Sequence, residues 1–323
     1  MNKDNNKIIP LTRDFMFAST FNDEENISVL EHFLSAYLTI PYDEIKGKVT
    51  LLSRHLPKEK RREASKEVDV LLKYGNEKII IEMNAQEFRE GKRDRNLVYA
   101  SKVLSGEYKS GDMRFSDIGR VLQINFTTVS SYFSGLKLDR LINEFKLLEV
   151  HNPKVCYSDK IEIDVIDMGK VGNYNYIDER ERVIGKWCKM ITSNTLEALQ
   201  KEAEWIMDDS TKEKLSKKVN ELSHDDEMVK LESDYSMIEL EMNTAIAEEK
   251  EKSYNEGIKQ GIEQGEKQGE KRGRELGRDE GVALGIKQER TSMIKKLLAS
   301  GIPKETIAKS LGIGIEEIDQ ITI

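Results

Sequence analysis

Apolar residues in the first part of the chain recur at two different spacings, which predict helices and strands. Between residues 14 and 38 they recur every three or four positions, with an interruption near Asn22, and Pro41 follows. This pattern is typical of an amphipathic helix that is broken once and then ends. The same spacing covers residues 93–108 and the residues around Trp187, so we expect helices there as well.

Shorter apolar runs lie between these helices and predict strands. They cover residues 49–52, 68–72, 78–84, 121–126 and 160–166. The second and third runs are separated by Tyr74-Gly75-Asn76-Glu77, whose Gly and Asn are typical of a β-hairpin turn. The element order is therefore α-β-β-β-α-β followed by β-α, which predicts an α/β fold with a mixed sheet flanked by helices.

From about residue 193 the pattern is entirely helical. We expect four parts: an α/β domain over 1–192, a helical extension over 193–256, a charged helical tether over 257–290 and a small helical module over 291–323. The tether carries glycine at every fourth position from Gly257 to Gly285. Each glycine costs a helix about 1 kcal/mol relative to alanine. The glycine row is therefore either a close contact between two helices or a tandemly expanded, partly helical tether.

The terminal module contains Ile307-Ala308-x-x-Leu311-Gly312, which fits a helix-turn-helix. The helix that would enter a DNA groove contains Glu316, Glu317 and Asp319. Because these carboxylates would repel phosphate, we expect the module to pack or self-associate, and we predict a homo-oligomer formed through the C-terminal helical region, with coiled-coil character.

Composition excludes several classes of protein. Charged residues make up 34% of the chain, no run of 18 apolar residues exists, and the N-terminus has no apolar stretch typical of a secretory signal. The two cysteines, Cys156 and Cys188, exclude a disulfide framework, and the four histidines are too scattered for a structural zinc site. We therefore expect a cytoplasmic protein with no membrane partner.

The net charge of −8 is unevenly distributed. Residues 1–150 hold 24 Lys and Arg against 23 Asp and Glu, whereas the remainder holds 27 against 36. The basic residues of the first part cluster in two stretches, which contain Arg54, Lys58, Lys60, Arg61, Arg62 and Lys66, and Arg89, Lys92, Arg93 and Arg95. Such clusters suit contacts to phosphates, and the alternative is a solvated, charged loop.

Two acids interrupt the apolar runs of the predicted hairpin. Asp69 lies in one run and Glu82 lies thirteen residues later in the next. A buried carboxylate is costly unless it is paired or bound to a cation, and Mg²⁺ takes one or two carboxylates. Strand alternation places Glu82, Asn84 and, if the strand continues, Gln86 on one face. The alternative is that each acid faces solvent or pairs with a nearby lysine.

These residues resemble the PD-(D/E)XK nuclease superfamily and, within it, the recombination-promoting nuclease/putative transposase (Rpn) family. The resemblance rests on TRDFMFA (12–18), EVDV (67–70), IIEMN (80–84) and RNLVYASK (95–102), together with the glycine-periodic tail. It implies a restriction-endonuclease-like fold and metal-dependent DNA endonuclease activity. Asp69 and Glu82 would be the metal ligands, with Mg²⁺ as the metal and Mn²⁺ or Ca²⁺ as alternatives.

The chain departs from the superfamily at one position. Where the superfamily has lysine two residues after the glutamate, and the Rpn family often has glutamine, this chain has Asn84. An amide can orient water or phosphate but cannot supply charge or take a proton. The missing cation could come from Lys102, which is otherwise an ordinary helix lysine, and Gln86 is an alternative amide.

Two hypotheses follow for the function. The first is a metal-dependent DNA endonuclease that hydrolyses phosphodiester bonds, in recombination, in mobile-element transfer or in defence. In that case Arg54, Lys58, Lys60, Arg61, Arg62, Arg93 and Arg95 would hold the DNA backbone. The second is a catalytically impaired DNA-binding or assembly protein on the same fold, for which Asn84 and the long tail are the reasons.

Overall fold

The computed structural model describes residues 6–56, 67–85, 91–108, 114–128, 138–172 and 174–322. The chain divides into two compact units, Met1–Met237 and Ile238–Ile323. In the described part the α-helices are α1 (Asp14–Phe21), α2 (Ile27–Leu38), α3 (Tyr42–Ile45), α4 (Lys92–Glu107), α5 (Glu179–Ile191), α6 (Leu196–Ala203), α7 (Asp209–Ser223), α8 (Asp226–Ala299), α9 (Lys304–Leu311) and α10 (Ile315–Thr322). The strands are β1 (Val49–Leu51), β2 (Val70–Tyr74), β3 (Glu77–Asn84), β4 (Val121–Thr127), β5 (Ile142–Leu148) and β6 (Cys156–Asp167).

The strands of the first unit form one mixed sheet. Their order is β1-β2-β3-β4-β6-β5. The strands β1, β2 and β3 are antiparallel neighbours, β3 and β6 each run parallel to β4, and β5 is antiparallel to β6. The predicted α/β fold with a mixed sheet is therefore confirmed, and the carboxyl ends of β3, β4 and β6 meet at the same edge.

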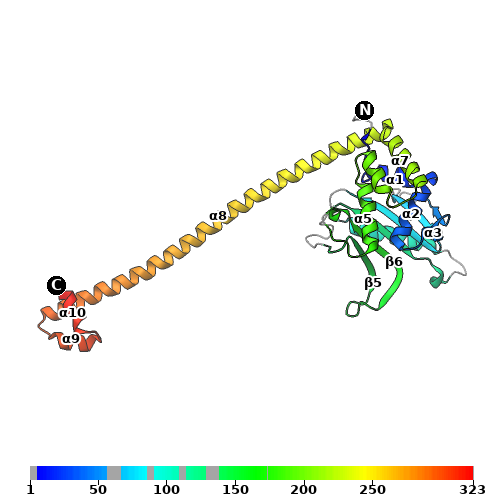
Figure 1. The fold of residues 1–323 in the computed structure, drawn as a ribbon. Coiled ribbons are helices and arrows are strands. Elements are labelled where there is room, and N and C mark those ends of the chain that lie inside the picture. The colour runs from blue at the N-terminus through cyan, green and yellow to red at the C-terminus, as the bar shows by residue number, and fades with distance from the viewer. Residues whose placement is uncertain are drawn as a thin grey trace, which may run out of the picture. The chain divides into compact units, whose positions relative to one another are not determined.

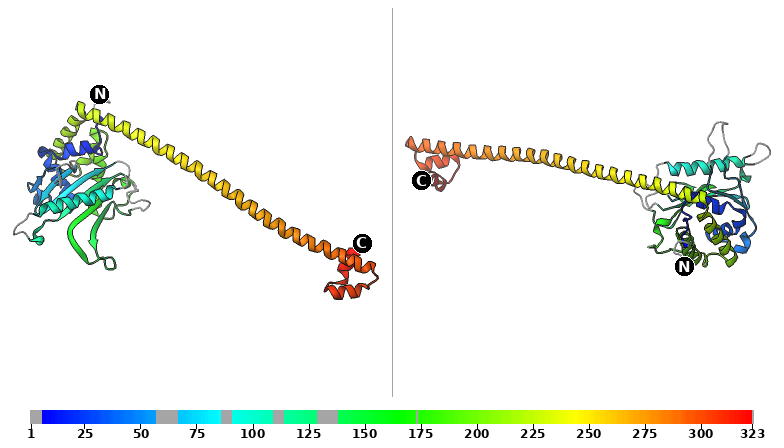
Figure 2. Two further views of the ribbon diagram at one scale, coloured as in Figure 1. Left: turned by 180° about the vertical axis from the view of Figure 1, so that it is seen from behind. Right: turned by 90° about the horizontal axis from the view of Figure 1, so that it is seen from above.

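Helices cover both faces of this sheet (Figures 1 and 2). On one face α1, α2, α5, α6 and α7 enclose the main core, where the Phe33 ring meets Trp187 edge-on at 5.4 Å. On the other face α4 covers a smaller core that contains Ile80, Tyr99 and Val121. The site described below lies on the α4 face, because Glu82 and Asn84 alternate with the core residues Ile81 and Met83.

The break in the first helical stretch has a local cause. The Asn22 side chain donates to the Ala18 carbonyl (2.9 Å) at the end of α1, and the Asp23 side chain accepts from the Glu25 N–H (3.0 Å). Both side chains satisfy backbone groups that a helix end leaves open. The hairpin turn is equally local, because Gly75 takes the left-handed φ of +58° that glycine adopts without strain.

Sequence patterning missed one strand, β5. Its residues read INEFKLL, and only Ile142 is buried while most of the others are exposed. As the outermost strand of the sheet it buries little on either face, so its sequence carries no strong alternation.

The first unit extends beyond the boundary expected after residue 192. Leu199 of α6 and Leu215 and Val219 of α7 are fully buried in the main core. The N-terminal segment also reaches α7, because the Ile9 N–H donates to the Ser223 hydroxyl (3.0 Å). The first part of the expected helical extension is thus integral to the α/β unit.

The glycine row lies in one continuous helix. α8 is 74 residues long and includes every glycine from Gly257 to Gly285. Each residue from 247 to 290 is exposed in the single chain. Without packing, a glycine-rich helix of this length has little to stabilise it apart from pairs such as Glu263–Lys267 and Glu270–Arg274.

The C-terminal module has a small core of its own. Ile294 of α8, Ile307 of α9 and Ile318 of α10 are buried together. The acids of α10 meet bases nearby, since Asp319 lies 2.6 Å from Lys304 of α9 and Glu317 lies 3.8 Å from Arg290 of α8. Among the described helices of the whole chain, none combines the length and apolar character that a membrane span requires.

A fragment that ends at Asn255 is expected to keep the fold of the first unit but to associate less than the full chain. The six strands of the described chain precede residue 168, and the buried side chains of the main core end at Val219. Circular dichroism melting of the fragment and light scattering of both proteins would test this. An unfolded fragment, or the same number of chains per particle in both, would contradict the expectation.

Candidate active site

The hairpin of β2 and β3 brings the two predicted metal ligands together. Asp69 lies immediately before β2, instead of inside the strand as expected, and Glu82 lies in β3. The Asp69 N–H donates to Glu82 Oε1 (3.2 Å), and the Met83 N–H donates to Asp69 Oδ2 (2.7 Å). These reciprocal hydrogen bonds across the hairpin hold both carboxylates at one place on the sheet.

Shielding from solvent raises the pKa of both carboxyl groups. Glu82 is 3% exposed and Asp69 is partly buried. Burial is the main cause that raises the pKa of Asp69, and the charge of Asp14 raises it further. Burial also raises the pKa of Glu82, followed by the charge of Asp69, while Arg95 opposes both shifts. Two such groups side by side favour binding a proton or a cation.

Neighbouring elements fix the backbone of Asp69. The Asn22 side chain at the end of α1 donates to the Asp69 carbonyl. Arg54, which follows β1, donates from Nε to the Val68 carbonyl (2.9 Å). The Arg54 charge also lowers the pKa of Asp69 and of Glu82. This predicted DNA-binding residue therefore lies beside the carboxylate pair.

Asn84 is held by an arginine from the helix that follows. Arg95, in the first turn of α4, donates from Nη2 to Asn84 Oδ1 (2.8 Å), and the same nitrogen lies 3.6 Å from Glu82 Oε2. Asn84 is 3% exposed, and its Nδ2 has no hydrogen-bond partner among the described residues. The Asn84 Oδ1 thus accepts from Arg95, and the buried Nδ2 remains as a hydrogen-bond donor.

Tyr99 completes this side of the site, and sequence patterning did not identify it. The Arg95 guanidinium lies 5.5 Å from the centre of the Tyr99 ring, one helical turn along α4. Burial raises the Tyr99 pKa, which the charges of Glu82 and Asp69 raise further. Because Tyr99 follows Arg95 by four positions in a predicted helix, the sequence does indicate that the two side chains share one helix face. Lys102 lies about 10 Å farther along α4 than Arg95, so its role as the missing cation stays a prediction.

The other predicted site residues are only partly described. Arg93 is exposed in the first turn of α4. Gln86, Lys58, Lys60, Arg61 and Arg62 lie outside the described residues. Their roles therefore stay predictions.

Further polar side chains line the same face at the carboxyl ends of the parallel strands. Asn84 of β3 is in register with Thr127 of β4, which is in register with Asp167 of β6, and Glu82 is in register with Asn125. Thr127, Asp167 and Asn125 are at most 4% exposed. Asn125 could have been noticed as a polar residue inside an apolar strand. Its proximity to Glu82 depends on strand pairing.

A family model described as PD-(D/E)XK nuclease family transposase matches residues 11–249. The chain belongs to this family. The match confirms the resemblance and supports a nuclease- or transposase-like function, with the DNA binding that this implies. Searches of curated proteins and of solved structures found no match.

Members of the PD-(D/E)XK family use divalent metals, and the hairpin of this family member fits one. Two carboxylates converge there, where Glu82 Oε1 and Asp69 Oδ2 each accept a backbone N–H. Oxygen donors are what Mg²⁺ prefers, and it commonly takes two carboxylates and keeps other positions for water and phosphate. The donor set of Asp69 and Glu82 is therefore suited to Mg²⁺, Mn²⁺ or Ca²⁺.

Three other carboxylates in the described chain lie close enough to share a cation: Glu144, Glu162 and Asp164. They belong to the opposite face of the sheet from Asn84, because Asp164 is in register with the core residue Ile124. Glu144 lies 2.6 Å from Arg180, and Glu162 lies 2.5 Å from Arg120. Asp164 accepts a hydrogen bond from the Tyr37 hydroxyl (2.6 Å). Because Glu144 and Glu162 are each paired with an arginine, this group fits a metal less well than the hairpin pair does, although the buried Asp164 Oδ1 has no hydrogen-bond partner among the described residues.

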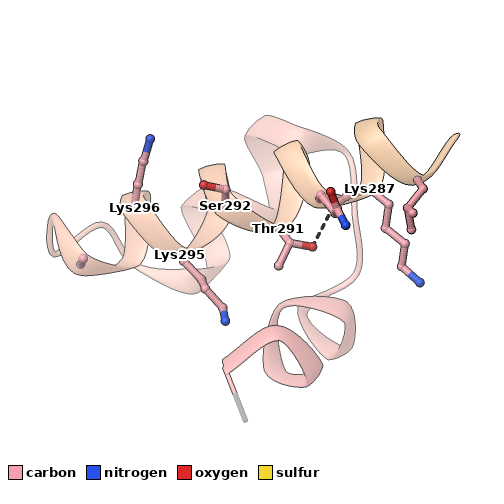
Figure 3. Close-up of a pocket in the computed structure, with 8 residues that line it drawn as sticks. Lys287, Thr291, Ser292, Lys295 and Lys296 are labelled. Carbon is pink, nitrogen blue, oxygen red and sulfur yellow. Dashed lines mark hydrogen bonds between the residues drawn. The ribbon is translucent and has the colours of Figure 1, made fainter. Parts of the chain in front are cut away.

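A groove on the last turns of α8 lies in the second unit (Figure 3). Its lining includes Lys287, Thr291, Ser292, Lys295 and Lys296, and the Thr291 hydroxyl donates to the Lys287 carbonyl (2.8 Å). The lining contains no carboxylate. It therefore lacks the groups that phosphodiester hydrolysis with a metal requires.

Proposed function

We propose that this protein is a metal-dependent DNA endonuclease that hydrolyses phosphodiester bonds. The observation that carries the proposal is the pair of the buried Glu82 and the partly buried Asp69, joined by reciprocal hydrogen bonds on a hairpin. Membership of the PD-(D/E)XK nuclease family supports it. We propose roles in DNA recombination, in mobile-element transfer or in defence.

Asp69 and Glu82 would hold the divalent metal. When bound, a metal at this site would lower the pKa of its water and neutralise charge on the phosphoryl transition state. Hydrolysis forms a bond from the water oxygen to phosphorus and breaks one P–O ester bond, and a proton passes to the departing oxygen. Arg54 and Arg93 would hold the DNA backbone near the carboxylates, which positions the phosphate without selecting a sequence.

Plasmid nicking by the purified full-length protein tests the proposal. Supercoiled plasmid would be incubated with Mg²⁺, Mn²⁺, Ca²⁺ or EDTA. We expect nicked and linear products with Mg²⁺ or Mn²⁺ and none with EDTA. Intact plasmid under every metal condition would contradict the proposal.

The basic stretch before the hairpin is expected to contribute binding and not chemistry. Replacing Lys60, Arg61 and Arg62 by alanine should weaken DNA binding and reduce the slope of log Kd against log salt by about one for each lost phosphate contact. Fluorescence anisotropy across a salt series measures the slope. An unchanged slope would show that these residues are only solvated.

We also propose that the protein assembles through its C-terminal helical region. α8 is exposed over more than forty successive residues from 247 to 290 in the single chain, although its glycines make an isolated helix costly. A partner helix from a second copy would offset that cost. The exposure of α8 in the single chain therefore favours the interpretation of the glycine row as a close contact between two helices.

A second candidate function is a catalytically impaired DNA-binding or assembly protein on the same fold. Asn84 favours it, because this position has lysine in the wider superfamily and an amide carries no charge. The nicking assay separates the two candidates, since an impaired protein would bind DNA with Ca²⁺ and cleave it under no condition.

A further inference from the structure

Arg95 occupies a position relative to Asn84 and Glu82 that sequence order does not suggest. It follows Asn84 by eleven positions in the sequence, yet its Nη2 donates to Asn84 Oδ1 at 2.8 Å. Its side chain is 42% exposed, whereas the Glu82 side chain is 5% exposed. The guanidinium is therefore fixed at its inner edge by Asn84 and remains accessible to a ligand from solvent.

Asn84 has a donor to offer at the same place. Because its Oδ1 accepts from Arg95, the group that remains is the Nδ2 donor, and this buried atom has no partner among the described residues. An unpaired buried donor costs free energy until an acceptor reaches it. Asn84 Nδ2 and the guanidinium thus form adjacent donors beside a pair of carboxylates suited to a metal.

Donors next to a cation site match the chemistry of a phosphodiester. Its anionic oxygens can accept from nitrogen donors while one of them faces a metal. Arginine suits this task, because its planar guanidinium presents several N–H groups and stays charged. One edge of Arg95 can bind Asn84 while another faces phosphate, and Tyr99 supports the guanidinium from α4.

We infer that Arg95, positioned by Asn84, is a catalytic residue that binds the anionic oxygens of the scissile phosphate. It takes the place of the lysine that the superfamily carries two residues after its glutamate. Arg95 is then part of the reaction centre and not only a general contact to the DNA backbone. The inference rests on the proposed endonuclease function and specifies which positively charged side chain contacts the scissile phosphate.

The test returns a positively charged side chain to position 84, where the superfamily has lysine. Plasmid cleavage would be measured for full-length Arg95→Ala, Arg95→Lys and the double variant Asn84→Lys/Arg95→Ala. Arg182→Ala is the matched control, because Arg182 is an exposed arginine on α5. Metal binding would be followed separately as the rise in melting temperature with Mn²⁺. Guanidinium ion would be added to Arg95→Ala as a chemical replacement for the lost group.

We expect Arg95→Ala to cleave about a hundredfold or more slowly, as when a donor to a developing oxyanion is removed. Arg95→Lys should retain part of the rate. The double variant and added guanidinium should each recover at least about tenfold over Arg95→Ala, which a purely structural role would not produce. The melting shift with Mn²⁺ should persist in Arg95→Ala, because Asp69 and Glu82 remain.

Two results would overturn the inference while the endonuclease proposal stands. One is cleavage by Arg95→Ala at the wild-type rate. The other is a slow Arg95→Ala variant that neither Asn84→Lys nor guanidinium improves. A wild-type protein that cleaves with no metal would instead overturn the proposed function, and this inference with it.

Discussion

Replacing Asp69 or Glu82 by alanine is expected to abolish metal-dependent DNA cleavage while the protein stays folded. Each variant would leave a single carboxylate at the site and so weaken the hold on the proposed metal, which would stabilise the transition state by several kcal/mol. The rate should fall by about a thousandfold or more, on the order of 4 kcal/mol. Plasmid nicking with Mg²⁺ or Mn²⁺ measures the loss.

Folding should survive these changes. Asp69→Ala loses one hydrogen bond, from the Met83 N–H, worth about 1 kcal/mol, and it also removes a poorly solvated charge. Glu179→Ala is a matched control, because Glu179 is an exposed acid on α5. Undiminished cleavage by either site variant, with the control also active, would show that the hairpin pair does not hold the metal.

The metal-free protein is expected to lose stability as the pH rises above the ordinary carboxyl range, and a divalent metal is expected to restore it. The pKa values of Asp69 and Glu82 are raised in the folded protein, mainly by burial. Groups with raised pKa values contribute their full stability below the unfolded pKa of about 4 and lose it as the pH rises through the folded pKa. With EDTA, the melting temperature should therefore be lower at about pH 8 than at about pH 5.

A bound metal reverses this trend because it competes with protons for the same oxygens. At a metal concentration about a hundred times Kd, the gain is about 2.7 kcal/mol, which corresponds to several degrees in melting temperature for a unit of this size. The gain should be present at about pH 8 and small at about pH 5. Differential scanning calorimetry with EDTA, Mg²⁺ or Mn²⁺ would measure both effects.

Glu82→Gln isolates the contribution of the hairpin pair. Asp164, on the other face of the sheet, has its pKa raised to about 7 by burial and contributes with the same sign. The informative quantity is therefore the difference between the wild type and Glu82→Gln, in which the pH dependence should be weaker and the metal effect lost. Identical pH and metal responses in the two proteins would refute the assignment.

The amino-acid sequence alone predicted most elements of the first unit and the two carboxylates of the candidate site. Helices and strands follow from local periodicity, as in the broken helix of residues 14–38 and the apolar run of residues 78–84. Asp69 and Glu82 belong to one hairpin with a two-residue turn, so their proximity is a local property of the chain. The edge strand β5 escaped notice because an exposed strand has no alternation to detect.

Only the tertiary structure decided which positively charged side chain lies beside the carboxylates of Asp69 and Glu82. Asn84 is the last residue of β3. The helix α4 connects β3 to the parallel strand β4, and the first turn of α4 lies next to the carboxyl end of β3. That geometry selects Arg95 as the arginine in contact with Asn84, and strand register places Asn125 beside Glu82. Periodicity within a segment reports which face is buried, but not which distant segment covers it, because pairing between segments depends on the packing of the whole unit. For the same reason, the burial of α6 and α7 in the main core could not be read from their helical pattern.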